Sequence, residues 1–428
     1  VMKPSWLVVL AAAGLLALAL QRLRHARARR TPRGWSGVSE VEWRVPVGCD
    51  FSGFFTEVAL GFLPPLHRAE HKRFKLLSGA CTEAFLNTYL TEAEAATFRD
   101  VWVAEEARSK QATRDSIVIE HGDPCGARAW PRDERPRHVV MRAMSEGDLA
   151  AEAAACLLLA DEVWVPTEWH VGVFAAAGVP RRMLHVIAEP VDTALFTPTR
   201  RRDPAATHRF IFLSSFKWEW RKGWDLLLRA YWAEFHAADS RPTLLRLKTY
   251  LPSWEAGPAD LNEWLDDYAI RHFRRRRSQL APVELCTDDL SREALRDLYE
   301  AADAFVLPTR AEGWGLPIAE AMAMELPVIA TNWSGPMAFL SPTNSFALPV
   351  ARHLAEGRAE PSVAALRERM RAVVADEDSI LRGKQARRDM VARFSPEVVA
   401  QQVLKRLAEI EAARKLSVPS LGRRPEAL

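Results

Sequence analysis

Residues 304–330, AFVLPTRAEGWGLPIAEAMAMELPVIA, have a short apolar run at each end and a helical pattern between the two runs. The runs Ala304–Leu307 and Pro327–Ala330 have the length and composition of buried strands. Pro317 fits the first turn of a helix, so the segment that follows the glycines is expected to be helical. Strand, helix and strand in this order predict a parallel βαβ unit.

The same alternation of apolar runs and helical patterns extends along the chain, with one interruption. Glu189–Pro198 (EPVDTALFTP) is rich in proline, and the polar run Thr199–His208 follows it. Such composition is typical of a linker. We therefore predict two α/β domains, residues 35–198 and 199–394, and a C-terminal amphipathic helix and tail over residues 395–428. The further strands expected are Ser116–Glu120, Arg137–Met141, Glu162–Val165, Arg209–Leu213 and Leu244–Lys248.

Composition and charge exclude several classes of protein. Hydrophobic residues make up 48% of the 428 residues and charged residues 26%, which is ordinary for a globular protein and excludes a disordered or fibrous one. The formal net charge is +3, yet residues 1–34 hold seven basic side chains and no acidic one. The rest of the chain has 51 basic against 55 acidic residues. Because acidic residues outnumber basic ones there, the composition does not predict a basic surface for a polyanion. Nucleic acid is therefore not an expected partner.

An apolar run near the beginning of the sequence predicts a membrane anchor. Trp6–Leu20 is uninterrupted by polar residues, and a cluster of arginines follows it within residues 22–33. As a helix the run would reach about 22 Å, short of a bilayer core of about 30 Å but able to span with help from its flanks. Arginines favour the cytosolic side, so residues 1–34 predict an anchor that holds a cytosolic catalytic domain, with an endomembrane as the expected site. An arginine-rich organelle transit peptide and a cleaved signal peptide remain alternatives.

The five cysteines predict no disulfide framework. Cys49, Cys81, Cys125, Cys156 and Cys286 are an odd count and contain no CxxC pair. We expect five small buried thiols in a reducing compartment.

The loop after Ala304–Leu307 is the first candidate site, because ligands of parallel sheets bind beyond the carboxyl ends of the strands. Gly313 and Gly315 allow the backbone to approach a ligand closely. The amides near Gly315 and Leu316 would point out of the helix end, where a pyrophosphate is favoured. Glu312 and Glu320 would flank these amides, which suits a nucleotide sugar with hydroxyls at both ends. A structural glycine turn, with Glu320 offsetting the helix dipole, is the alternative.

A second candidate cluster follows Arg209–Leu213. Lys217, Arg221 and Lys222 lie within six residues, next to Gly223 and among tryptophans. Cations at the end of a strand can neutralise a diphosphate, and the tryptophans would shield that contact from water. A solvated basic loop explains the same residues equally well.

Three elements together resemble a nucleotide-sugar glycosyltransferase of family 4, which has the GT-B fold. They are EGWGLPIAEAMA with its Glu312-x7-Glu320 spacing, RKG at Arg221–Gly223, and the bridge that begins DEVWVPTEWH and ends EPVDTALFTP. The resemblance covers about Val45–Phe394. It implies two Rossmann-like domains that face each other across a cleft. It also implies transfer of a hexose from a nucleoside diphosphate sugar to a hydroxyl acceptor, with retention of anomeric configuration and without metal or cofactor.

The resemblance also implies roles for single residues. In the family, the second glutamate of the motif (Glu320) binds the ribose and the first (Glu312) faces the donor sugar. Backbone amides at Gly315 and Leu316 contact the donor, and Lys222 binds its diphosphate. The family usually has an arginine six residues before that lysine, where this chain has Phe216. Lys217 or Arg221 could replace it.

The first domain is expected to complete the site. Gly53, within GCDFSGFFTE, resembles the glycine of a loop near the donor phosphates, and His121 resembles the family's active-site histidine. A turn histidine capped by Asp123 is the alternative for His121. Arg142, Glu146 and Asp148 follow a predicted strand and are acceptor-side candidates.

Three further features bear on rival interpretations. Asp376–Asp378 spells a DxD motif in a polar helical stretch, and we interpret it as a solvent-facing segment that binds no metal. Asn332-Trp333-Ser334 is the one N-glycosylation sequon; it would lie in the cleft, which favours a cytosolic domain. A catalytically inactive GT-B scaffold that binds nucleotide or glycan is the alternative function. A dehydrogenase or epimerase is disfavoured, because the dinucleotide glycines are missing.

Overall fold

The structure is a computed structural model. It describes residues 40–45, 57–70, 73–78, 81–104, 113–126, 130–199, 209–236, 239, 241–375 and 378–417. Residues Glu40–Lys405 form one compact unit, which contains both large sheets.

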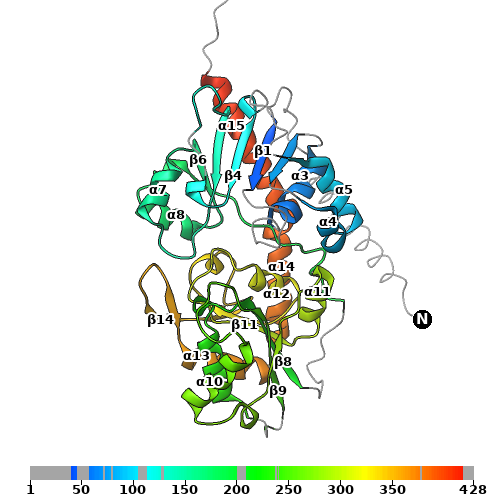
Figure 1. Ribbon diagram of the computed structural model, residues 1–428, viewed down its shortest axis with the longest axis vertical. Coiled ribbons are helices and arrows are strands. Elements are labelled where there is room, and N and C mark those ends of the chain that lie inside the picture. The colour runs from blue at the N-terminus through cyan, green and yellow to red at the C-terminus, as the bar shows by residue number, and fades with distance from the viewer. Residues whose placement is uncertain are drawn as a thin grey trace, which may run out of the picture. The chain divides into compact units, whose positions relative to one another are not determined.

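The N-terminal half is built on a parallel sheet. In the described residues this sheet has seven strands in the order β3-β2-β1-β4-β5-β6-β7, visible in the upper part of Figure 1. The central strands are buried on both faces, as expected for a parallel sheet covered by helices on both sides. The strands are β1 (Val41–Val45), β2 (Phe74–Ser78), β3 (Trp102–Ala104), β4 (Ile117–His121), β5 (His138–Arg142), β6 (Glu162–Val165) and β7 (Leu184–Val186).

Local capping signals explain where several helices of this half begin. Thr91 and Glu94 form a capping box at the start of α5 (Glu92–Val101). The Thr167 hydroxyl accepts the His170 N–H at the start of α8 (Glu168–Ala176). The other helical elements of this half are η1 (Glu57–Phe62), α3 (Leu63–Ala69), α4 (Glu83–Tyr89), η3 (Pro124–Gly126), α7 (Ala151–Leu157) and η4 (Arg181–Met183).

The C-terminal half is built on a second parallel sheet, whose strand order positions the candidate site. In the described residues it has six strands in the order β10-β9-β8-β11-β12-β13. The order reverses between β8 and β11, and ligands of open α/β sheets bind at such a reversal. The strands are β8 (Phe210–Lys217), β9 (Thr243–Tyr250), β10 (Val283–Cys286), β11 (Ala304–Leu307), β12 (Val328–Thr331) and β13 (Phe346–Leu348).

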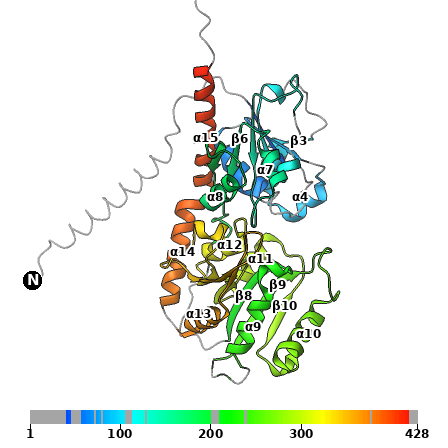
Figure 2. The ribbon, with the colours of Figure 1, turned by 90° about the vertical axis from the view of Figure 1, so that its left-hand side faces the viewer.

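Helices pack around this second sheet (Figure 2). The end of α14 (Asp378–Phe394) lies against the linker between the two halves, because the Val191 N–H donates to the Phe394 carbonyl at 2.8 Å. A small antiparallel pair, β14 (Val350–His353) and β15 (Ala359–Pro361), stands apart from the sheet. The helical elements are η5 (Trp220–Lys222), α9 (Trp224–Glu234), α10 (Leu261–Phe273), η6 (Arg277–Gln279), α11 (Arg292–Glu300), α12 (Leu316–Ala323), η7 (Gly335–Ala338), α13 (Val363–Ala375), α14 (Asp378–Phe394) and α15 (Pro396–Ser417).

The predicted architecture of two parallel α/β halves is confirmed, and the predicted βαβ unit is formed by β11, α12 and β12. The predicted boundary at residue 198 falls between β7 and β8. One strand differs from its prediction: Arg209–Leu213 was expected, but β8 continues to Lys217 because its register with β9 extends to Tyr250. Residues 214–217 are therefore strand and not loop.

The predicted anchor at residues 6–20 lies outside the described residues. Within the part of the chain that the structure describes, no helix has the length and apolar character needed to span a bilayer.

The prediction of five free thiols is wrong for at least three residues. Cys125 in η3 and Cys156 in α7 form a disulfide across a sequence separation of 31, and Cys81 is also disulfide-bonded. Sequence spacing could not reveal the pair, because η3 follows β4 and α7 follows the neighbouring strand β5, so that only the sheet brings them together. The cysteines therefore no longer support a reducing compartment. The cytosolic location stays a prediction that rests on the arginine cluster and the sequon.

Removing this disulfide should destabilise the N-terminal half. The double variant Cys125→Ala/Cys156→Ala is expected to lose about 3 to 4 kcal/mol of unfolding free energy, because a closed loop of this length restricts the unfolded chain. Urea denaturation measures the loss, and Cys286→Ala, which removes a free thiol, is the matched control. Peptide mapping under non-reducing conditions that finds both cysteines alkylated would contradict the pairing.

Candidate functional site

The loop after β11 is held in one conformation by the segment after β12. Glu312 N–H donates to Ser334 Oγ at 2.9 Å, and Gly335 N–H donates to the Glu312 carbonyl at 3.0 Å. A Cβ on Gly335 would collide with the carbonyl oxygen of Gly313, so the close approach of the two segments requires glycine. Gly315 has φ 98° and caps α12, where L-residues with side chains are strained. The main chain of Glu312 is therefore held in place by the segment after β12.

The loop after β8 packs directly on the loop after β11. Gly223 ends η5 with φ 74°, and a Cβ there would collide with the Pro308 carbonyl. Arg310 N–H donates to the Arg221 carbonyl at 2.7 Å, and the Arg310 guanidinium makes two 2.8 Å contacts with the Asp225 carboxylate. These contacts place the side chains of Arg221 and Lys222 beside Glu312.

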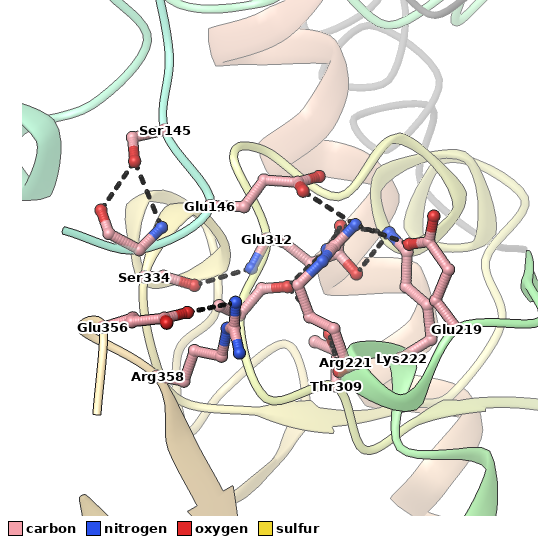
Figure 3. A network of polar contacts seen from close by, with 12 residues as sticks. Ser145, Glu146, Glu219, Arg221, Lys222, Thr309, Glu312, Ser334, Glu356 and Arg358 are labelled. Atoms are coloured by element: carbon pink, nitrogen blue, oxygen red, sulfur yellow. Dashed lines mark hydrogen bonds and ion pairs between the residues drawn. The ribbon is translucent and has the colours of Figure 1, made fainter. Parts of the chain in front are cut away.

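Figure 3 shows the resulting network of acids and cations. Lys222 Nζ donates to both oxygens of Glu312, at 2.9 and 2.8 Å. Arg221 lies 3.6 Å from the same carboxylate and donates to the Ala311 carbonyl at 2.8 Å. Its Nη2 contacts Glu219 at 3.0 Å and Glu146 at 2.8 Å. The Glu146 contact joins the N-terminal half to this cluster.

Glu312 and Glu320 sit in opposite electrostatic environments. Burial alone would raise the pKa of Glu312, but Lys222 and Arg221 hold it below its usual value, so this carboxyl is ionised at neutral pH. Burial raises the pKa of Glu320 to about 7, although Tyr299 Oη donates to its Oε2 at 2.8 Å. The two carboxyls thus face different neighbours on either side of the N-terminus of α12.

The structure brings Arg221 to Glu312 and places Lys217 elsewhere. Lys217 is exposed at the end of β8, and its ammonium lies 5.6 Å from the centre of the Trp254 ring. Phe216 is buried and stacks on Trp218 at 5.9 Å. Because β8 continues to Lys217, alternation turns Phe216 inward and Lys217 outward. Sequence analysis gave Lys217 and Arg221 as possible replacements for the family arginine. Arg221 is the one that lies in the cluster with Glu312.

His121 lies in a separate buried cluster of the N-terminal half. It is 2% exposed at the end of β4, where its Nδ1 accepts from Trp43 Nε1 at 3.2 Å and its Nε2 lies 3.4 Å from Glu57. Arg142 binds the same glutamate at 2.7 Å. Burial lowers the pKa of His121, so the ring is neutral at pH 7. Asp123 accepts the Cys125 N–H at 2.8 Å and so caps η3.

Some predicted residues cannot be placed, and some contacts were missed by sequence reasoning. Gly53 lies outside the described residues, as do Asp376 and Glu377 of the DxD motif; elsewhere in the described chain, no group of His, Cys, Asp and Glu is arranged to hold a metal ion. Tyr299, which binds Glu320, carried no motif signal. Ser334, which orients Glu312, was noticed only as part of the sequon.

Comparison with known families and structures agrees with this geometry. Residues 207–360 match the family model described as glycosyl transferases group 1. These residues are therefore similar to a group 1 glycosyltransferase domain. No curated protein matches the chain.

Solved structures resemble nearly the whole chain and show its fold. Alr3699/HepE from Anabaena, in complex with UDP, is 16% identical with a TM-score of 0.63, over 86% of this chain and 100% of that one. Sucrose-phosphate synthase from Thermosynechococcus elongatus is 15% identical with a TM-score of 0.62, over 88% and 100%. The apo lipopolysaccharide outer core galactosyltransferase WaaB is 13% identical with a TM-score of 0.58, over 87% and 99%. The chain therefore has the GT-B fold, as the sequence resemblance implied, and residues 207–360 lie in its C-terminal half.

The raised pKa of Glu320 predicts a pH-dependent stability. The ordinary value is 4.5 and the folded value about 7, so between these pH values the folded state keeps a proton that the unfolded state has lost. Wild-type unfolding free energy should then fall as pH rises through this window. Glu320→Gln removes the titration, and its stability relative to wild type should rise by about 3 kcal/mol between pH 4.5 and 8.

Urea denaturation across this pH range measures the effect. Glu293→Gln, a change of one exposed carboxylate at the start of α11, controls for loss of a surface charge. A wild-type-to-Glu320→Gln difference that stays constant with pH would rule out a carboxyl that titrates near neutrality.

Proposed function

We propose that this protein is a retaining glycosyltransferase of family 4 that transfers a hexose from a nucleoside diphosphate sugar to a hydroxyl acceptor. The observation that carries the proposal is the contact of Lys222 with Glu312 beside the N-terminus of α12, at the strand-order reversal of the C-terminal half. A cation and a carboxylate meet there at the start of a helix, an arrangement that suits a phosphorylated sugar.

The donor diphosphate would lie between the cations and the helix end. The first N–H groups of a helix have no acceptor within the helix, and the helix dipole favours an anion there. Gly315 and Leu316 would supply those amides, and Lys222 with Arg221 would supply positive charge. The solved complexes of Alr3699/HepE with UDP and with UDP-glucose, on the same fold, support a nucleotide sugar as the ligand class.

Charge stabilisation would do most of the catalytic work. Lys222 and the α12 amides would stabilise the diphosphate as it leaves, and they are held in place before reaction by the backbone contacts of both loops. Glu312, ionised and with its main chain held by Ser334, would face the developing positive charge of the donor sugar. These cations supply the charge that a metal would otherwise bring, so we propose no metal or other cofactor. A direct contact of His121 with the donor sugar stays a prediction.

The acceptor would enter from the N-terminal half. A groove of about 500 Å³ lies between α8 and the loop after β5, lined mainly by apolar side chains with Asp148 among them. Trp169 in its lining lies 6.4 Å from Trp333, edge to face, and Trp333 precedes the serine that holds Glu312. We propose that the hydroxyl-bearing end of the acceptor approaches through this groove. Attachment to a membrane through residues 6–20 stays a prediction.

Substitutions at the two glutamates should separate turnover from donor binding. Glu312→Gln is expected to lose most turnover, at least about 100-fold, with a modest loss of donor affinity, because the charge near the reacting carbon disappears. Glu320→Ala is expected chiefly to raise the donor KM. Nucleotide release from a panel of UDP- and GDP-sugars measures both, and Glu293→Gln is the control. Donor binding without nucleotide release in wild type would indicate an inactive scaffold, and wild-type kinetics in both variants would refute the site.

A further inference from the structure

Glu146 reaches from the N-terminal half into the cation cluster of the C-terminal half. Its carboxylate lies 2.8 Å from Arg221 Nη2, on the guanidinium that also contacts Glu219 and Glu312. We propose that Glu146 is a built-in competitor of the donor: it occupies Arg221 in the free protein and is displaced when a donor diphosphate binds. The inference rests on the proposed function and adds a residue that tunes donor affinity.

The position of Glu146 is built by its loop. Ser145 Oγ donates to the Gly147 carbonyl at 2.7 Å (Figure 3). The Asp148 N–H donates to the Glu356 carbonyl at 3.0 Å. A Cβ on Gly147 would collide with that same Glu356 carbonyl. The loop is therefore docked on the β14–β15 turn, and docking aims the glutamate at Arg221.

Charge shows why a carboxylate at this place must compete. The cluster has three acids, Glu146, Glu219 and Glu312, against two cations, Arg221 and Lys222. A diphosphate ester brings one negative charge on each phosphoryl group. Those charges would enter a cluster that already has an excess of acid. One carboxylate must leave or lose its charge before both cations can turn to the phosphates.

Glu146 is the acid that can leave at the lowest cost. The exposed fraction of its side chain is 48%, against 17% for Glu219 and 5% for Glu312. It can therefore swing into water, where its charge is solvated. Partial burial raises the pKa of Glu146, and the acids Glu312 and Glu219 add to this, although Arg221 and Lys222 oppose it. Its departure would also release one of the contacts between the two halves.

Donor-side binding to the full-length protein tests the proposal. Isothermal titration with UDP, with GDP and with inorganic pyrophosphate would compare wild type with Glu146→Gln and Glu146→Ala. Both variants should bind UDP or GDP, and also pyrophosphate, about fivefold to tenfold more tightly. The donor KM should fall by a similar factor while kcat changes much less. Glu356→Gln is the matched control, because its carboxylate lies at the same junction but pairs with Arg358 at 2.6 Å, and its affinity should stay at the wild-type value.

The outcomes separate this inference from the proposed function. Wild type that binds none of the probes, together with variants that bind none, would overturn both. Wild type that binds a nucleoside diphosphate with an affinity equal to or higher than that of Glu146→Gln would overturn the inference and leave the proposed function standing. A loss of kcat at unchanged donor KM would also overturn it, because Glu146 would then act in the reaction and not as a competitor. An equal gain of affinity in Glu356→Gln would show that loss of any surface carboxylate at this junction has the same effect. That result would overturn the competitor role of Glu146.

Discussion

The contact between Lys222 and Glu312 depends on how two loops of neighbouring strands pack. β8 and β11 pair in parallel, so both loops leave the sheet at the same edge. Gly223 allows the first loop to touch Pro308 at the start of the second, and Arg310 fastens the two through the Arg221 carbonyl. A side chain on that glycine would push the loops apart and move Lys222. The chemistry of the cluster therefore rests on a backbone approach that only glycine permits.

The same helix end gives two glutamates of one motif different properties. Glu312 precedes α12 and faces two cations, whereas Glu320 lies within the helix and faces the Tyr299 hydroxyl. The cations keep the first ionised, and burial holds the pKa of the second near neutrality. The ionised Glu312 beside Lys222 and Arg221 suits the charged part of a ligand. The Glu320 carboxyl, whose pKa is near neutrality, suits hydrogen bonds with hydroxyl groups. The eight-residue spacing of Glu312 and Glu320 thus places one carboxyl among cations and the other in a buried, uncharged surrounding.

Sequence could predict the elements that repeat a short-range pattern. The apolar runs and Pro317 located β11, α12 and β12, and the cluster Arg221–Gly223 was found at the end of a predicted strand. The choice between Lys217 and Arg221 was left open, because it depends on how far β8 pairs with β9. The Cys125–Cys156 pair could not be predicted, because it is set by the adjacency of β4 and β5. In each case the outcome depends on which strand lies next to which in the sheet, and the sequence does not show this.

The loop after β5 shows how the neighbour decides the role of a charged residue. Sequence grouped Arg142 and Glu146 as acceptor-side candidates because both follow the same apolar run. Arg142 is the last residue of β5 and is buried, where it binds Glu57 and donates to the Ile187 carbonyl at 2.8 Å. It therefore ties η1 to the segment after β7 and has a structural role. Glu146 lies only four residues further on, yet its neighbour is the Arg221 guanidinium of the other half, so its charge acts on the cluster that contains Lys222 and Glu312.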